Sequence, residues 1–248
     1  MPVADSGVMA IQAPSVAESF DASSGPLVYI DDVNGVLWTV NLSTNEMRRI
    51  GNQGVMLTDL AFDPKNHHLY GVSFNAFYEV NTTTGNATYI GSLGISDANA
   101  LVFDANGKGY TEGFQNAMLW AIDNVNTGSV TSIGSTGNWK SGGDLTFYNN
   151  ALILSGYRGT LQNSTKESIV TLNRNTGAVL SAVATNLTQL FGLVSTSTNH
   201  LYGFANTSLY RVVPAASEVS KRTVLIRNFK AAGVGQILGA AFNGNFQT

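Results

Sequence analysis

The chain has 248 residues and a mass of 26.2 kDa, which fits one large all-β domain or two smaller domains. Charged residues make up 12% of it, about half the usual share, and hydrophobic residues make up 44%, so a disordered polyelectrolyte is excluded. Thirteen basic residues against 16 acidic ones give a net charge of −3. That balance provides no electrostatic footprint for nucleic acid or for an anionic membrane.

Targeting signals and cysteines restrict the setting further. No apolar stretch reaches the roughly 18 residues of a membrane helix, and the start MPVADSGVMAIQAPS lacks the basic and long apolar regions of a secretory signal. The absence of cysteine excludes disulfides, thiolate metal sites and thiol catalysis, yet fits either redox compartment. A polar composition of Asn, Ser, Thr and Gly in place of Lys and Glu favours a bacterial exported protein. We therefore expect an extracellular or cell-surface location.

In chain order, residues 1–25 fit no repeat and predict a flexible arm or strap, and from residue 26 onward short apolar strands recur with a regular period. One column of strands begins at Asp59, Ala100, Asp144, Gly192 and Gly239, at spacings of 41, 44, 48 and 47 residues. Three further columns begin at Leu27, His68, Lys108, Ala151 and His200; at Leu37, Phe77, Leu119, Ile169 and Leu209; and at Met47, Ala87, Val130, Val179 and Arg222. These strands are rich in Val, Ile, Leu, Tyr and Phe and are separated by turn residues.

The two ends of the repeat region complement each other. The first unit, residues 26–54, lacks a first strand, whereas residues 236–248 supply a first strand with nothing after it. The joints NTTTGN, NVNTGS and NRNTGA between third and fourth strands predict tight hairpins. We therefore predict an all-β fold: a single five-bladed β-propeller of four-stranded antiparallel blades, closed by the C-terminal strand. Its other blades are 56–94, 96–137, 140–186 and 189–229. A sandwich or solenoid would not need complementary half-repeats.

The second repeat, LTDLAFDPKNHHLYGVSFNAFYEVNTTTGNATYIGSLG, carries a family resemblance. It resembles the repeat LAFDP…LYG…LY.ID..TG.AT.IG of bacterial, mostly exported β-propeller proteins of unassigned function. The resemblance covers residues 57–137 well and the other blades loosely, and it implies a propeller at the cell surface or outside the cell. The blade pattern is also remotely similar to quinoprotein-type, virginiamycin B lyase-type and SMP-30-type propellers, but no matching set of metal ligands is present.

The alignment sorts the loops into two faces. Loops between second and third strands and loops that join blades form the face on which propellers usually bind. Its candidate ligand-binding residues are Glu112, Phe114, Trp139, Lys140, Tyr157 and Arg158. Aromatic faces beside polar groups suit a sugar ring, whereas aromatic residues at loop ends also fill propeller cores. The segment SGYRGTLQNSTKES, 14 residues long, is predicted to be an unusually long loop.

Carboxylates at one repeated position are the second candidate site. Asp59 and Asp144 share the first-strand position in alternate blades, and near the channel mouth they would hold a cation or act as an acid–base pair. Hydrogen bonding to neighbouring backbone amides is the structural alternative. The run DANGKG from Asp104 has the spaced oxygens of a calcium loop but also those of a hairpin. His67 and His68 lie in one turn and His200 lies in the equivalent turn of another blade, which argues against a zinc ion shared by all three.

Three functions follow from these observations. The first is a non-enzymatic recognition module that binds a carbohydrate, in the manner of a lectin, or a protein partner through the loop-rich face, with no cofactor beyond a possible Ca²⁺. The second is a propeller enzyme, a metal-assisted lyase or lactonase or a glycoside hydrolase, centred on Asp59, Asp144 and Glu112. The third is a structural subunit of an extracellular assembly. The recognition module fits best, because every recognisable motif specifies strands and turns.

Overall fold

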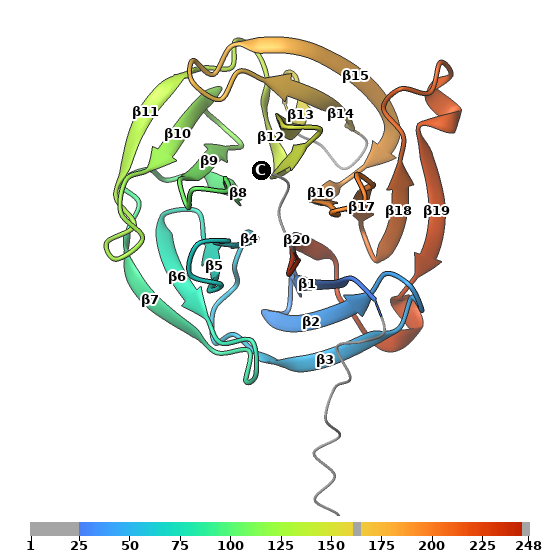
Figure 1. The fold of residues 1–248 in the computed structure, drawn as a ribbon, viewed down its shortest axis with the longest axis horizontal. Coiled ribbons are helices and arrows are strands. Elements are labelled where there is room, and N and C mark those ends of the chain that lie inside the picture. The colour runs from blue at the N-terminus through green and yellow to red at the C-terminus, as the bar shows by residue number, and fades with distance from the viewer. Residues whose placement is uncertain (1–24, 161–164, 245–248) are drawn as a thin grey trace, which may run out of the picture.

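Five antiparallel sheets surround a central axis in the computed structural model, which describes residues 25–160 and 165–244 (Figure 1). Each sheet has four strands, so the predicted five-bladed propeller is confirmed. The predicted arm of residues 1–25 lies outside the described residues except for its last position. No helix in the described ranges is long and apolar enough to cross a membrane.

The strands follow one another around the axis blade by blade. Blade one contains β20 (Ile237–Phe242), β1 (Leu27–Asp32), β2 (Val36–Asn41) and β3 (Met47–Asn52); blade two contains β4 (Asp59–Phe62), β5 (Leu69–Val72), β6 (Ala76–Val80) and β7 (Ala87–Ser92). Blade three contains β8 (Ala98–Phe103), β9 (Gly109–Gly113), β10 (Met118–Ile122) and β11 (Val130–Ser135); blade four contains β12 (Lys140–Tyr148), β13 (Ala151–Tyr157), β14 (Lys166–Leu172) and β15 (Val179–Thr188). Blade five contains β16 (Leu190–Ser195), β17 (Leu201–Ala205), β18 (Ser208–Val212) and β19 (Thr223–Asn228), with 3-10 turns η2 (Val219–Lys221) and η3 (Lys230–Ala232) beside β19.

The ring closes where the sequence predicted. The last strand, β20, pairs antiparallel with β1, so that Val28 lies opposite Phe242 and Asp31 lies opposite Gly239. This pairing makes the C-terminal strand the innermost strand of the N-terminal blade (Figure 1). Hydrogen bonding between the two ends of the chain removes an inner sheet edge that would otherwise be open.

Neighbouring blades interlock at the rim through glycine. The outer-strand residue Gly51 lies against the β6–β7 hairpin of the next blade, where an added Cβ atom would stand 1.9 Å from the Thr84 carbonyl oxygen. Gly91 and Gly134 repeat this contact with the hairpins of blades three and four. A side chain has no room at such a site, so the repeated Ile-Gly of the fourth strand specifies how blades stack.

Blade four departs from the predicted boundaries. Strand β12 begins at Lys140, earlier than the expected start at Asp144, and its register shifts between Ser141 and Leu145. Strand β13 extends to Tyr157 and β14 starts at Lys166. The loop predicted to run for 14 residues is therefore confined to residues 158–165, because both ends of that segment pair as strands; residues 161–164 lie outside the described ranges.

Candidate functional site: an axial cup on the loop face

An apolar cup opens at the propeller axis on the face that the alignment marked for binding. Its volume is about 290 Å³, close to the lower end of the roughly 300–1,000 Å³ typical of ligand pockets. Every blade contributes to it, through loops between second and third strands, loops that join blades, and the first residues of inner strands. The lining residues are Val33, Met56, Thr58, Phe74, Asn99, Phe114, Gly142, Gly143, Phe191 and Leu238.

Aromatic rings form much of the cup wall. The rings of Phe74 and Phe114, from adjacent blades, are 5.3 Å apart between centroids and inclined at 56°. Opposite them, Gly143 adopts a φ of +149°, and a Cβ atom there would stand 2.6 Å from the Cα atom of Phe191. The glycine therefore allows the chain of blade five to approach closely, which brings the Phe191 ring to the cup.

One polar side chain of the cup has an unused acceptor. Asn99, at the start of β8, is 9% exposed. Its side-chain amide nitrogen donates a long hydrogen bond of 3.4 Å to the Ser141 carbonyl, whereas its Oδ1 atom has no hydrogen-bond partner. This acceptor is buried and does not face the hollow, so the accessible lining of the cup is apolar and the cup suits an apolar group.

Three buried carboxyl groups, which we call the acid layer, gather one residue deeper along the channel. Asp59 and Asp144 follow the cup residues Thr58 and Gly143, and Asp31 reaches in from β1. None of the three has exposed surface. A Cβ atom on Gly239 would lie 2.6 Å from Oδ1 of Asp59 and 2.9 Å from Oδ1 of Asp31, so this glycine leaves the space that both carboxyls occupy.

Backbone amides hold two members of the acid layer. Asp59 accepts hydrogen bonds from the N–H groups of Leu60 at 2.8 Å and Leu101 at 2.6 Å. Asp144 accepts one from the N–H group of Leu193. Because Leu101 and Leu193 belong to the inner strands of the following blades, each carboxyl ties one inner strand to the next. Asp59 and Asp144 thus hydrogen-bond to neighbouring backbone amides, which was the structural alternative to a cation site or an acid–base pair.

Burial raises the pKa of Asp59, Asp144 and Asp31 well above the usual range. The charge of Asp144 adds to this increase at Asp59, because two neighbouring buried carboxyl groups disfavour a second negative charge. No carboxyl group of the acid layer is therefore exposed to a substrate in the cup. Within residues 25–160 and 165–244, no group of three or more His, Asp or Glu is arranged to hold a metal ion.

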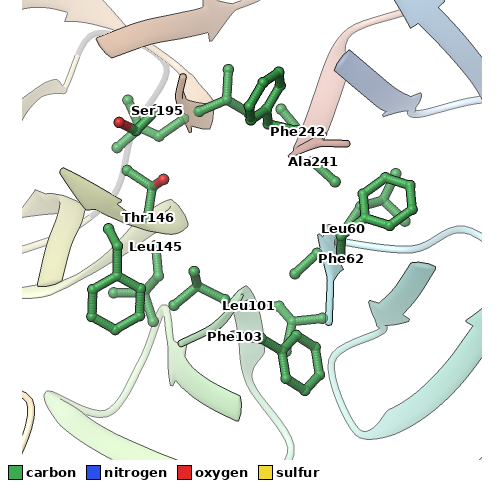
Figure 2. A pocket seen from close by; sticks show the side chains of 15 residues that line it. Leu60, Phe62, Leu101, Phe103, Leu145, Thr146, Ser195, Ala241 and Phe242 are labelled. Atoms are coloured by element: carbon green, nitrogen blue, oxygen red, sulfur yellow. The ribbon is translucent and has the colours of Figure 1, made fainter. Parts of the chain in front are cut away.

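Below the acid layer the channel narrows to a second cavity of about 50 Å³ (Figure 2). Each inner strand contributes three consecutive residues to its wall, such as Leu60–Phe62 of β4 and Leu101–Phe103 of β8. A buried water needs about 10–15 Å³, so this cavity has room for a few water molecules and not for an organic ligand.

The residues proposed for stacking on a sugar lie mostly inside the protein. Trp139 is 8% exposed and packs in the hydrophobic core of blades three and four, while the Arg158 guanidinium stands 4.3 Å from the centroid of its ring. Tyr157 is 2% exposed, and its hydroxyl donates to the carbonyl of Phe114. Lys140 donates to the carbonyl of Gly159 at 3.4 Å. Both aromatic faces are thus already occupied.

The remaining predicted residues divide between the cup and the interior. Phe114 lines the cup. Glu112 is fully buried, accepts a hydrogen bond of 3.0 Å from Thr136, and has a pKa that burial raises well above the usual range. Phe74, Phe191 and Asn99 also line the cup, in or beside loops of the face predicted to bind, whereas no sequence feature indicated Met56 or Leu238 as lining residues.

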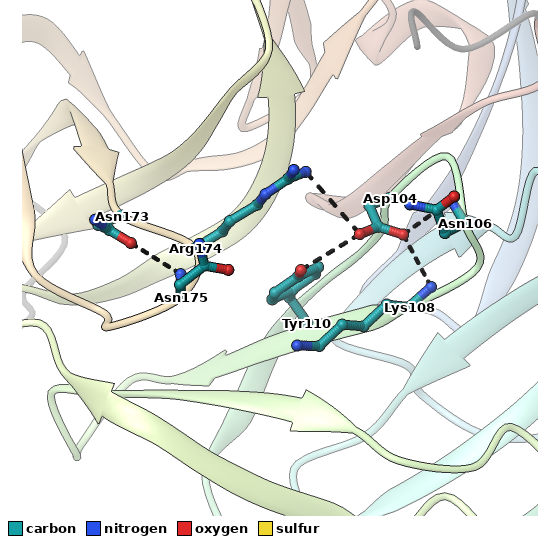
Figure 3. Close-up of polar contacts among 7 residues, drawn as sticks. All are labelled: Asp104, Asn106, Lys108, Tyr110, Asn173, Arg174 and Asn175. Atoms are coloured by element: carbon teal, nitrogen blue, oxygen red, sulfur yellow. Dashed lines mark hydrogen bonds and ion pairs between the residues drawn. The ribbon is translucent and has the colours of Figure 1, made fainter.

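The candidate calcium loop is a hairpin stabilised by its aspartate (Figure 3). One oxygen of Asp104 accepts from the N–H groups of Asn106 and Lys108, each at 3.0 Å. The other accepts from the Tyr110 hydroxyl at 3.4 Å and lies 4.0 Å from the Arg174 guanidinium of the next blade. Burial, followed by the charge of Asp104, raises the pKa of Tyr110 to about 12. Both carboxylate oxygens therefore already have partners.

The histidines lie in equivalent turns of two blades, as the alignment predicted, with His67 and His68 in blade two and His200 in blade five. His67 has a φ of +61°, a turn conformation. The Nδ1 atom of His68 lies 2.8 Å from a carboxylate oxygen of Glu79 within blade two. His200 lies in the equivalent turn of blade five, where its N–H group donates to Thr196.

Comparisons with known proteins place the chain in the class of β-propellers by fold alone. No protein-family model matches the sequence, and no curated protein matches it. A chain from a structure described as "The de novo evolutionary emergence of a symmetrical protein is shaped by folding constraints" is 20% identical, with a TM-score of 0.51 over 86% of this chain and 93% of that one. A chain in the crystal structure of a nidogen/laminin complex is 14% identical, with a TM-score of 0.54 over 87% and 84%.

A third similar structure carries no assigned function. It is a protein of unknown function from Bacteroides caccae, 10% identical, with a TM-score of 0.50 over 88% of this chain and 99% of that one. At such low identities the three similarities support the fold and transfer no residue roles.

Proposed function

We propose that this chain is a non-enzymatic recognition module that binds a partner protein by accepting an apolar side chain in the axial cup. The observation that carries the proposal is the exposed apolar rim formed by Val33, Met56 and Phe74 around a cavity of about 290 Å³. An apolar hollow with an exposed apolar rim is typical of an anchor site at a protein interface. The protein in the nidogen/laminin complex indicates that a similar fold occurs in a protein–protein assembly.

The carbohydrate alternative has less support. A sugar needs several polar partners beside an aromatic face, and the cup offers Phe rings with little else. The enzymatic alternative needs carboxyls that a substrate can reach, whereas Asp59, Asp144 and Glu112 have no exposed surface. The family resemblance and the polar composition support an exported setting, which remains part of this proposal.

A peptide-display selection against the immobilised full chain tests the proposal. We expect enriched peptides to share one large apolar residue and to lose affinity about 10- to 100-fold in a Phe74→Ser variant, since full burial of such a side chain contributes about 1.5–3 kcal/mol. Tyr89→Ser removes an aromatic side chain on β7 that is 59% exposed, against 41% for Phe74, and as the matched control it should leave affinity unchanged. Enrichment that Phe74→Ser does not weaken, or binding only on a glycan array, would contradict the proposal.

A further inference from the structure

Exposed hydrophobic side chains gather at a second place, the outer edge of blade five. Among the described residues, the large apolar side chains that remain exposed fall at the cup rim, at two isolated sites, and on this edge. The edge group is Val219, Val224, Leu225 and Ile226. Val224 is 53% exposed and Leu225 57% exposed, on the outermost strand β19, which pairs only with β18 within its sheet.

This strand lacks the rim interlock found elsewhere. In blades one to three the outer-strand residue opposite Leu37, Phe77 or Leu119 is a glycine that lies against the next hairpin. In blade five the corresponding position, opposite Leu209, is Arg227, and Arg227 is exposed. Strand β19 therefore presents Arg227 and exposed apolar side chains to solvent, where the outer strands of blades one to three have a packed glycine.

The same edge has a charge opposite to that of the rest of the chain. Residues 218–230 contain four of the 13 basic residues, namely Lys221, Arg222, Arg227 and Lys230, and one of the 16 acidic residues. The remainder thus has nine basic residues against 15 acidic ones. Within the segment Glu218 pairs with Lys221 at 2.7 Å, which leaves the positive charge concentrated around Arg222, Arg227 and Lys230.

We propose that β19 is a docking edge for an extended, acidic segment of a partner protein, in which apolar residues alternate with Asp or Glu. An added strand supplies hydrogen-bond partners to the open backbone edge, apolar contacts to Val224 and Leu225, and carboxylates to Arg227 and Lys230. A lipid surface leaves the strand's backbone groups unsatisfied. A second copy paired through β19 brings like charges together, which disfavours self-association.

The docking edge is separate from the cup, so the two proposals can fail independently. A random 12-residue peptide library is displayed against the full chain, and enriched peptides are measured by fluorescence anisotropy at 50 mM and 500 mM NaCl. We expect alternating acidic and apolar residues, and affinity reduced at least tenfold both by the double variant Arg227→Glu, Lys230→Glu and by high salt. Adding the peptide should slow hydrogen exchange in residues 223–228.

Matched controls separate this edge from other surfaces. Leu180→Ser removes an apolar side chain that is 63% exposed on the outer strand β15, and Phe74→Ser alters the cup; neither should change affinity for the acidic peptides. Peptides without acidic residues, affinity within twofold in the double variant, or no peptide enriched for this edge would overturn the proposal. So would binding to vesicles of 3:1 phosphatidylcholine and phosphatidylserine without peptide binding, which would assign the edge to a lipid surface.

Discussion

Gly239 is the position where a single methyl group should weaken ring closure. A Cβ atom added there would meet the Cα atom of Asp59 at 2.5 Å and its Oδ1 atom at 2.6 Å. The first contact is with backbone, so β20 or β4 must shift. Overpacking of this kind costs about 1–3 kcal/mol, and disturbing the hydrogen bond from Leu101 to Asp59 adds about 1–3 kcal/mol. We therefore expect Gly239→Ala to lower the free energy of unfolding by about 2–6 kcal/mol.

The assay is urea denaturation followed by tryptophan fluorescence, with a thermal melt alongside. A loss of about 3 kcal/mol corresponds to a Tm lower by roughly 6–12 °C for a chain of this size. Gly192→Ala is the matched control, because it occupies the same first-strand position and its Cβ atom would meet only side chains, at 3.0 Å from Ala240 and 3.1 Å from Phe204. Equal losses in both variants, or a loss below about 1 kcal/mol in Gly239→Ala, would refute the account of the acid layer.

Three further predictions concern buried polar groups. Burial raises the pKa of Glu167 from 4.5 to about 7, so the folded state binds this proton more tightly than the unfolded state does. The free energy of unfolding therefore falls as pH rises between these values. Glu167→Gln should remove about 3 kcal/mol of that pH dependence in denaturation series at pH 4.5–7.5. Tyr157→Phe should cost about 1–3 kcal/mol and speed hydrogen exchange near Phe114, whose carbonyl loses its donor. Asp104→Ala should lower Tm by several degrees, whereas Asp104→Asn should lower it less because it keeps an acceptor for the turn N–H groups. Added calcium should leave the Tm of the wild-type protein unchanged.

The blade architecture was predictable because its signals are local and repeated. The Thr-Gly hairpins recur in three blades, and Gly85, Gly128 and Gly177 all adopt the positive φ that such turns require. Blade one lacks the glycine, and there Asn45 takes a φ of +58°. Closure of the ring was equally predictable. The C-terminal repeat has a first strand and no further strands, and the N-terminal repeat has the other three strands and no first strand, so the two complete one blade.

The site was less predictable because it depends on register between distant strands. Asp31 reaches the acid layer only because β1 pairs with β20 so that Asp31 faces Gly239, 208 positions along the chain. The sequence left two positions open for Trp139, a loop of the binding face or the propeller core. In the structure β12 begins at Lys140, before the expected start at Asp144, and the indole next to it packs in the core. The repeat period in the sequence gives the spacing of strands along the chain, but it does not reveal a register shift within one strand such as β12.

The acid layer separates the cup from the lower part of the central channel. The cup lies on one side of Asp31, Asp59 and Asp144 and the small cavity on the other, and these carboxyls expose no surface to either. Passage along the axis would require breaking the amide hydrogen bonds that join neighbouring inner strands, at about 1–3 kcal/mol for each group left unsatisfied. Under the proposed function the cup is therefore closed from below, and a bound group would enter and leave through the loop face. Under the proposed function its selectivity must then arise from the rim and the apolar wall, since nothing below them is accessible from the cup.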